Sequence, residues 1–259
     1  MSSIGFWHFA QQAPGKLALA APDGRHWSRG ELLDECKRIV RDLHGQGLQP
    51  GDRVVTTLPN CAELIALSLA VSKIDCVLIA QQADKGTISK PSRTIRAATD
   101  AAEVSAQLSN DRQLQKMAEI AQLMALFDIK PETRNVHYCG CPLQFPEAMR
   151  WAVNSLHYGH SVVLVDQWDA EGMLRAIDQY RVTTSYMLSD QFSRLLALPR
   201  ELRERYDVSS TRHMIYSDMA CPPAVKQSMI DWWGMSIYQC SGQHSKYDRS
   251  ENPGKLINY

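Results

Sequence analysis

Apolar positions along this chain recur at two spacings, and the two spacings alternate. Short runs rich in β-branched and aromatic residues indicate strands, whereas apolar residues every three to four positions indicate amphipathic helices. The predicted strands are Leu17–Ala21, Arg53–Thr57, Cys76–Ala80, Val136–Cys139, Ser161–Val165, Thr183–Leu188, His213–Ser217 and Ser236–Cys240. Strands separated by helices predict βαβ units. We therefore expect an α/β fold of mostly parallel sheets flanked by helices.

The predicted helices differ in how clearly their ends are marked. Ser28 precedes a periodic stretch and Glu31 stands three residues later, which is the pattern of a capping box. The turn Pro22-Asp23-Gly24 predicts a hairpin just before that helix. A second helix is expected to open at Asn60 and to run through Val71. The other predicted helices are Phe6–Gln12, Arg112–Leu126, Glu147–Tyr158, Ala170–Tyr180, Asp190–Leu198, Glu201–Tyr206 and Pro223–Trp233.

Composition narrows the class of protein. The 259 residues include 28 basic and 28 acidic side chains, so no global field attracts nucleic acid, and none is expected as a partner. No apolar run is long enough to span a membrane, and residues 1–12 lack the pattern of a secretory signal. Seven cysteines at irregular spacing indicate reduced thiols. These features predict a cytoplasmic protein.

The stretch Arg205–Gly242 combines a short strand, the turn Cys221-Pro222-Pro223, an amphipathic helix and a second short strand. It resembles the nucleotide-site half of acyl-CoA synthetases, in the adenylate-forming (AMP-binding) superfamily. Leu48–Glu63 resembles the opening domain of the same enzymes. The resemblance covers about residues 5–80 and 128–243. It implies a fold like part of the N-terminal domain of these enzymes, which activate carboxylates with ATP.

Four segments are expected along the chain. Residues 1–80 form an N-terminal α/β lobe, and residues 81–127 form an irregular linker and a helix, with residues 81–110 lacking periodicity. Residues 128–243 form an α/β lobe with a parallel sheet, and residues 244–259 form a C-terminal tail. The family's later ribose-binding Asp and its mobile C-terminal domain would lie beyond Tyr259. By resemblance, this is a truncated member of the superfamily.

The segment Gly86–Arg93 resembles the phosphate-binding loop of the family. Thr87 and Lys90 match its hydroxyl and basic positions, so they are candidate remnants of the nucleotide pocket. Ser92, however, occupies the place of the loop lysine, which removes the charge that would face a phosphate. The segment is interpreted as a vestigial phosphate loop.

Two further turns depart from the family in the same way. Ser217, Asp218 and Met219 occupy a turn where the family has small residues against adenine. Ser241 and Gly242 lie where the family has an aromatic-Gly-x-Thr-Glu motif. The residues of both turns, Ser217, Asp218, Met219, Ser241 and Gly242, are further candidate remnants of the nucleotide pocket. His244 and Ser245 stand where the family has Thr and the metal-binding Glu. The resemblance therefore implies a nucleotide site without its reactive groups.

Phe145 is the candidate acyl-pocket residue. The segment Cys141–Pro146 resembles the family's Pro-Leu-Tyr-His segment beside the acyl pocket, with Phe145 at the histidine position. An aromatic there suits either an apolar pocket or ordinary core packing. His137, Cys139 and Cys141 share a strand-like spacing, but no second ligand pair accompanies them, so no metal site is expected.

Three hypotheses about function follow. The first is a non-catalytic domain that binds an acyl group, an acyl carrier or a partner protein, with self-association or a partner covering exposed core surface. The second is an enzyme acting on an acyl thioester without ATP, with Asp218, Cys240 and His244 as candidate catalytic residues. The third is a non-functional relic. No cofactor is expected; ATP with Mg²⁺, and CoA, would be used only if a residual AMP-forming ligase activity persists.

Overall fold

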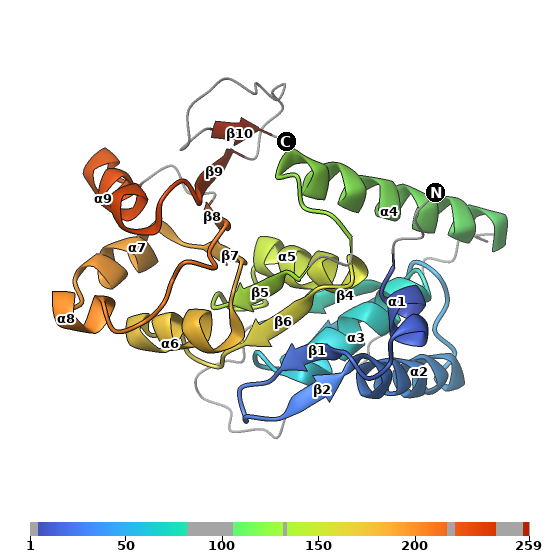
Figure 1. Ribbon diagram of the computed structural model, residues 1–259. Coiled ribbons are helices and arrows are strands. Elements are labelled where there is room, and N and C mark those ends of the chain that lie inside the picture. The colour runs from blue at the N-terminus through green and yellow to red at the C-terminus, as the bar shows by residue number, and fades with distance from the viewer. Residues whose placement is uncertain (1–4, 82–105, 132–133, 217–220, 242–255, 259) are drawn as a thin grey trace.

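An eight-stranded sheet forms the centre of the computed structural model, which describes residues 5–81, 106–131, 134–216, 221–241 and 256–258 (Figure 1). Its strand order is β10-β9-β8-β7-β5-β6-β1-β2. Every neighbouring pair is parallel except the hairpin of β1 and β2. The strands are β1 (Leu17–Ala20), β2 (His26–Ser28), β5 (Val136–Cys139), β6 (Ser161–Leu164), β7 (Thr184–Met187), β8 (His213–Tyr216), β9 (Ile237–Ser241) and β10 (Leu256–Asn258). The predicted α/β fold class is confirmed.

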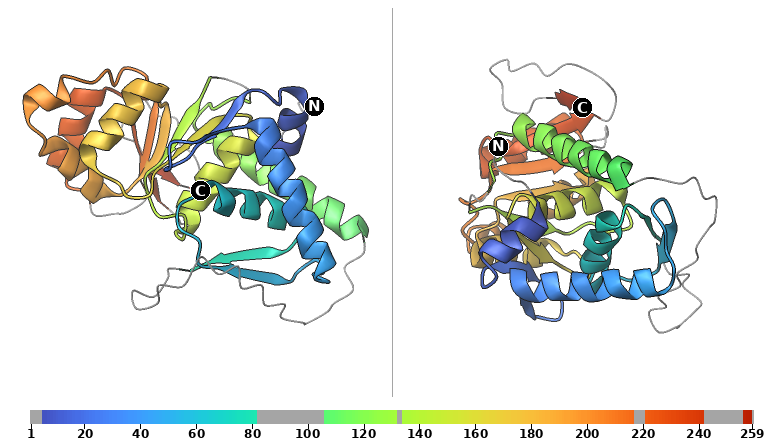
Figure 2. Two further views of the ribbon diagram at one scale, coloured as in Figure 1. Left: turned by 90° about the horizontal axis from the view of Figure 1, so that it is seen from below. Right: turned by 90° about the vertical axis from the view of Figure 1, so that its right-hand side faces the viewer.

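A second, two-stranded sheet lies apart from the first. Its strands β3 (Arg53–Thr56) and β4 (Val77–Ala80) are parallel and are joined by helix α3 (Ala62–Lys73). This is one βαβ unit, as the spacing predicts. In Figure 2 the pair of strands lies on the far side of α3 from the large sheet.

Helices cover both faces of the large sheet. Successive side chains of a strand point to opposite faces, so strands with apolar residues at neighbouring positions have apolar side chains to bury on each face. Cys139 packs with α1 (Phe6–Gln12), α2 (Arg29–Gly45) and α3, whereas its neighbour Tyr138 packs with the helices of the opposite face. On the first face also lie α4 (Ala106–Leu126) and α5 (Pro146–His157). On the opposite face lie α6 (Ala170–Tyr180), α7 (Ser189–Leu196) and α9 (Pro223–Trp233), with α8 (Arg200–Arg203) following α7.

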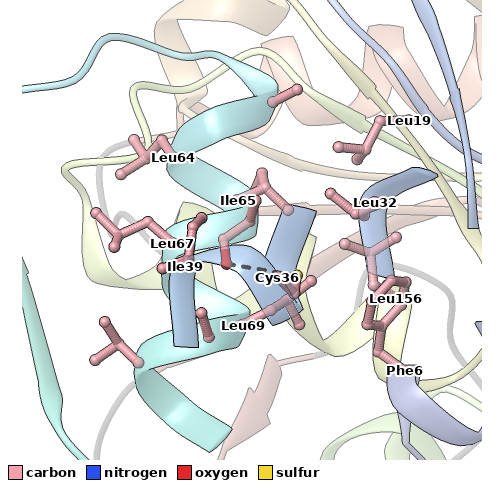
Figure 3. Packing of buried hydrophobic residues seen from close by; sticks show 14 of the residues in the cluster. Phe6, Leu19, Leu32, Cys36, Ile39, Leu64, Ile65, Leu67, Leu69 and Leu156 are labelled. Atoms are coloured by element: carbon pink, nitrogen blue, oxygen red, sulfur yellow. Dashed lines mark hydrogen bonds between the residues drawn. The ribbon is translucent and has the colours of Figure 1, made fainter. Parts of the chain in front are cut away.

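Packing of α2 against α3 forms the core of the N-terminal part (Figure 3). Leu32, Cys36 and Ile39 on α2 meet Ile65 and Leu69 on α3, and all five are at most 1% exposed. Each buried aliphatic side chain contributes about 1.5–3 kcal/mol to stability. The Cys36 thiol also donates to the Ala66 carbonyl oxygen at 3.5 Å, which joins the two helices by a polar contact.

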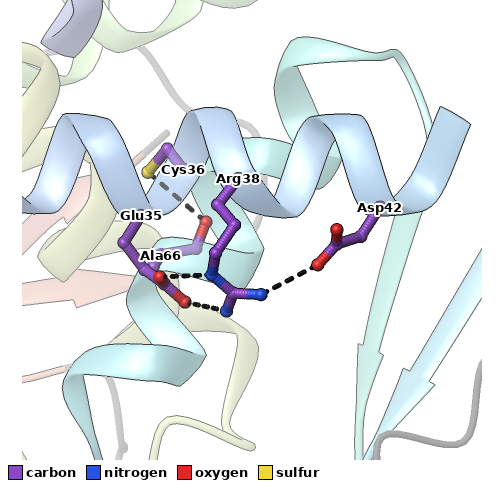
Figure 4. A network of polar contacts seen from close by, with 5 residues as sticks. All are labelled: Glu35, Cys36, Arg38, Asp42 and Ala66. Carbon is purple, nitrogen blue, oxygen red and sulfur yellow. Dashed lines mark hydrogen bonds and ion pairs between the residues drawn. The ribbon is translucent and has the colours of Figure 1, made fainter. Parts of the chain in front are cut away.

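Helix α2 begins as the sequence predicts. The Glu31 backbone N–H donates to Ser28 Oγ at 3.2 Å, and the Ser28 N–H donates to Glu31 Oε2 at 2.8 Å, which completes the capping box. On the exposed side of α2, Arg38 donates to both carboxylate oxygens of Glu35 and to Asp42 Oδ2 (Figure 4). Such exposed pairs contribute only a few tenths of a kcal/mol each.

Two predicted helix starts were wrong. Helix α3 begins at Ala62 rather than at Asn60, because the Asn60 side chain is buried in long-range contacts and caps no helix. Helix α4 begins at Ala106, so the prediction that residues 81–110 are irregular throughout fails for residues 106–110. Ala106, Gln107 and Leu108 have high helix propensity, which extends the helix toward its N-terminus. None of the described helices is long and apolar enough to cross a bilayer.

Candidate functional site

The carboxyl ends of β5 and β6 are joined by one buried side chain, that of Asn60. Its Nδ2 donates to the carbonyl oxygens of Cys141 and Val165, both at 3.1 Å, and its Oδ1 accepts from the Leu143 N–H at 2.8 Å. Asn60 is only 7% exposed. Carboxyl ends of parallel strands are the usual location of ligand sites in such sheets. Asn60 thus fixes the loops at this edge.

Gly140 follows β5 at a point where no larger residue fits. A Cβ atom there would lie 2.4 Å from Trp168 Cδ1 and 2.7 Å from Tyr138 Cε1. Trp168 in turn lies under the guanidinium of Arg194, whose Cζ is 4.6 Å from the ring centroid. The glycine therefore lets the loop after β6 approach the end of β5 closely.

A groove of about 460 Å³ lies between α3, β4 and α5. Its size falls within the range of small-molecule sites, roughly 300–1,000 Å³. Among the described residues that line it, Arg150 is the only charged one. We call it the α3–α5 groove; its lining is Ser68, Ser72, Leu78, Ile79, Ala80, Leu143, Gln144, Pro146, Met149, Arg150, Val153 and Asn154.

Phe145 lies at the rim of the α3–α5 groove. It is the residue before α5, it is 48% exposed, and its neighbours Gln144 and Pro146 both line the groove. Gln144 Nε2 donates to the Leu58 carbonyl oxygen at 3.1 Å, which ties the rim to the residues after β3. Phe145 is thus no core residue, and the ordinary-core alternative for it is wrong.

Most of the predicted site residues lie outside the described residues. This applies to Thr87, Lys90, Ser217, Asp218, Met219, Gly242 and His244. Cys240 and Ser241 lie in β9, where they pair with Ile257 and Asn258 of β10, but only their backbone is described. The candidate catalytic residues and the nucleotide-pocket remnants therefore stay predictions.

His137, Cys139 and Cys141 make separate contacts. His137 Nδ1 lies 3.0 Å from Thr184 Oγ1, and its ring stacks on Trp151 at 6.3 Å. The Cys141 thiol donates to the Tyr186 carbonyl oxygen at 3.5 Å. Burial lowers the pKa of His137 to about 3, with the charge of His160 as a smaller cause. Within the described part of the chain, no three His, Cys, Asp or Glu residues are grouped to hold a metal ion.

The mostly parallel sheet with its flanking helices has the fold of the N-terminal domain of adenylate-forming enzymes. The family model for AMP-binding enzymes matches residues 6–131 and 106–243, so the chain belongs to this family. It shares 32% identity over 56 residues with the acyl-CoA ligase sidI of Aspergillus fumigatus, 22% of this chain and 10% of that protein.

Solved structures agree with this fold. The chain resembles MatB from Rhodopseudomonas palustris with a TM-score of 0.71 and 17% identity, covering 98% of this chain and 64% of that one. The N-terminal domain of FACL13 from Mycobacterium tuberculosis gives a TM-score of 0.70 and 15% identity, covering 93% and 76%. The chain thus spans less than two thirds of MatB and a tenth of the fungal ligase in these matches.

Sequence reasoning missed Asn60 and Arg150 as residues of this region. Asn60 precedes a helix, so its side chain suggests local capping, and nothing in its neighbourhood signals contacts with Cys141 and Val165. Arg150 has the helical spacing of an exposed residue. Only the position of α5 against α3 and β4 shows that it lines a groove.

Proposed function

We propose that this member of the AMP-binding family binds an acyl group in the α3–α5 groove and does not adenylate it. The observation that carries the proposal is the apolar groove that opens beside Phe145, the residue at the family's acyl-pocket position. The partly exposed side chains of Leu78, Met149 and Val153 offer the surface that an aliphatic chain would bury. Each buried methylene contributes about 0.8 kcal/mol.

Arg150 gives the groove a polarity that suits a carboxylate. Its Nη1 lies 3.7 Å from Glu147 Oε1, and its side chain is 39% exposed, so the pair is a loose surface contact. A carboxylate at this end of the groove would accept charge-assisted hydrogen bonds from the guanidinium. The proposed ligand is therefore an aliphatic carboxylate or its thioester, free or on a carrier protein.

The absence of adenylation rests on residue chemistry. Adenylation needs charge stabilisation as pyrophosphate leaves, and each missing group costs about 10²–10³ in rate. Ser92 replaces the loop lysine, and Ser245 replaces the glutamate that would hold Mg²⁺. A serine hydroxyl lacks the negative charge of the carboxylate ligands that Mg²⁺ prefers. The donor set in the sequence therefore does not fit the metal.

Displacement of a fluorescent fatty acid tests the binding proposal. Ser68→Phe places a ring in the groove and should weaken binding at least tenfold, whereas Ser193→Phe, on the exposed side of α7, should leave it unchanged. Arg150→Gln should weaken binding of the free acid but not of its methyl ester. Equal affinities for all three variants and the parent protein would contradict the proposal.

ATP–pyrophosphate exchange tests the second half of the proposal. No exchange above background is expected with acetate, hexanoate or palmitate. Sustained exchange would establish residual ligase activity instead. Hydrolysis of an acyl thioester that Cys240→Ala abolishes would favour the ATP-independent enzyme, the alternative derived from the sequence.

A further inference from the structure

A second cavity opens at the opposite edge of the large sheet, where the strands begin. It measures about 480 Å³ and lies against the first residues of β1, β5 and β6. Because these three strands are parallel, their amino ends meet there, away from the α3–α5 groove. We call it the amino-end pocket; its lining is Lys16, Leu17, Arg29, Arg134, Asn135, Val136, Gly159, Ser161, Tyr180 and Arg181.

The amino-end pocket gathers positive charge. Four of its lining residues are basic, and none of the described lining residues is acidic. On a chain with 28 basic and 28 acidic side chains, such a concentration of one sign is a local feature. Arg181 forms an ion pair with Asp207, which offsets one of the four charges. Lys16 and Arg134 are exposed and pair with no acidic residue in the described part of the chain.

Arg29 is the fixed element of the pocket. It is only 4% exposed, its Nη2 donates to the Gly159 carbonyl oxygen, and its Cζ lies 6.0 Å from the centroid of the Phe9 ring. A guanidinium stays protonated at all ordinary pH values, so this charge is permanent. The Arg29 guanidinium is thus held at the floor of the pocket by its hydrogen bond to the Gly159 carbonyl oxygen.

We propose that the amino-end pocket binds a small, multiply charged phosphate anion. Guanidinium groups match phosphate oxygens with two parallel hydrogen bonds, and an ammonium adds a point charge. Lys16 and Arg134 lie exposed at one pocket together with the buried Arg29, and this grouping of basic side chains suits a di- or triphosphate better than a monoanion. The site is separate from the proposed acyl groove and does not depend on it.

Isothermal titration with inorganic tripolyphosphate tests this site. Lys16→Gln and Arg134→Gln should each weaken binding by about ten- to a hundredfold, the loss expected for one charge-assisted hydrogen bond. Arg53→Gln removes the same charge from an exposed position on β3 and is the matched control; it should bind like the parent protein. Affinity should fall with added salt.

Four results would overturn the proposal. The first is no binding of tripolyphosphate at millimolar concentration. The second is binding that neither Lys16→Gln nor Arg134→Gln weakens, which would place the anion elsewhere, including the nucleotide region. The third is an equal loss of tripolyphosphate affinity in Arg53→Gln, which would show that the loss depends only on the net charge of the protein. Binding of citrate as tightly as tripolyphosphate would refute the preference for phosphate.

Discussion

Three buried histidines should make this fold lose stability in mild acid. His137, His157 and His160 are 1%, 7% and 3% exposed. Burial lowers the pKa of His137 to about 3 and that of the other two to about 4. The charge of Lys116 lowers the pKa of His157 a little further. At His160, a hydrogen bond to the Lys130 backbone raises the pKa, and the charge of Arg29 lowers it; both effects are smaller than that of burial.

The sign follows from proton binding. In the unfolded chain a histidine takes up a proton near pH 6.5, whereas the folded sites do so only near pH 3 to 4. Between these values the unfolded state binds more protons, so the free energy of unfolding falls as the pH falls. When the pH falls from about 7.5 to about 5.5, each of these histidines lowers the free energy of unfolding by about 1.4 kcal/mol, and the three together lower it by about 4 kcal/mol.

Urea unfolding followed by tryptophan fluorescence measures this loss. His137→Gln retains a polar partner for Thr184 Oγ1 but cannot take up a proton, so the difference between the two pH values should shrink by about 1.4 kcal/mol. His44→Gln, at an exposed position near the end of α2, is the control and should leave the difference unchanged. An undiminished difference in His137→Gln would refute the reasoning.

Other substitutions test how the edge of the sheet is held, each by urea unfolding at neutral pH. Asn60→Ala removes three hydrogen bonds and should lower stability by about 2–4 kcal/mol; a loss below 1 kcal/mol would contradict its bridging role. Gly140→Ala should cost about 1–3 kcal/mol, whereas Gly45→Ala, with no atom near its Cβ, should cost nothing. Trp151→Ala empties a site that is 1% exposed and should cost about 3–5 kcal/mol, so a mild effect would show the core to be loosely packed there.

Features set by short-range chemistry could be predicted from the sequence. The capping box of Ser28 and Glu31, the hairpin at residues 22–24 and the bounds of α6 and α9 all depend on residues a few positions apart. One of the two wrong helix starts, that of α3, reflects a competing interaction. At Asn60 long-range hydrogen bonds replace a local cap, because the side chain finds partners 81 and 105 positions away.

The sites were less predictable because they are formed by contacts between distant segments. Phe145 could be proposed from its motif alone, but the groove beside it needs α3, β4 and α5 together. The amino-end pocket needs β1 to pair with β6, where Leu19 lies opposite Val162. Total charge conceals such a pocket, since 28 acidic residues elsewhere balance the basic ones. The expected division into lobes stays a prediction.

The two proposed sites lie at opposite ends of the same strand, and this separates their tests. Val136 opens β5 at the amino-end pocket, whereas Leu143 and Gln144 follow its other end and line the α3–α5 groove. A strand of four residues spans roughly 13 Å. Substitutions farther apart than about 10 Å usually act additively. We therefore expect Arg134→Gln to weaken phosphate binding and to leave acyl binding unchanged. Either proposal can fail without the other.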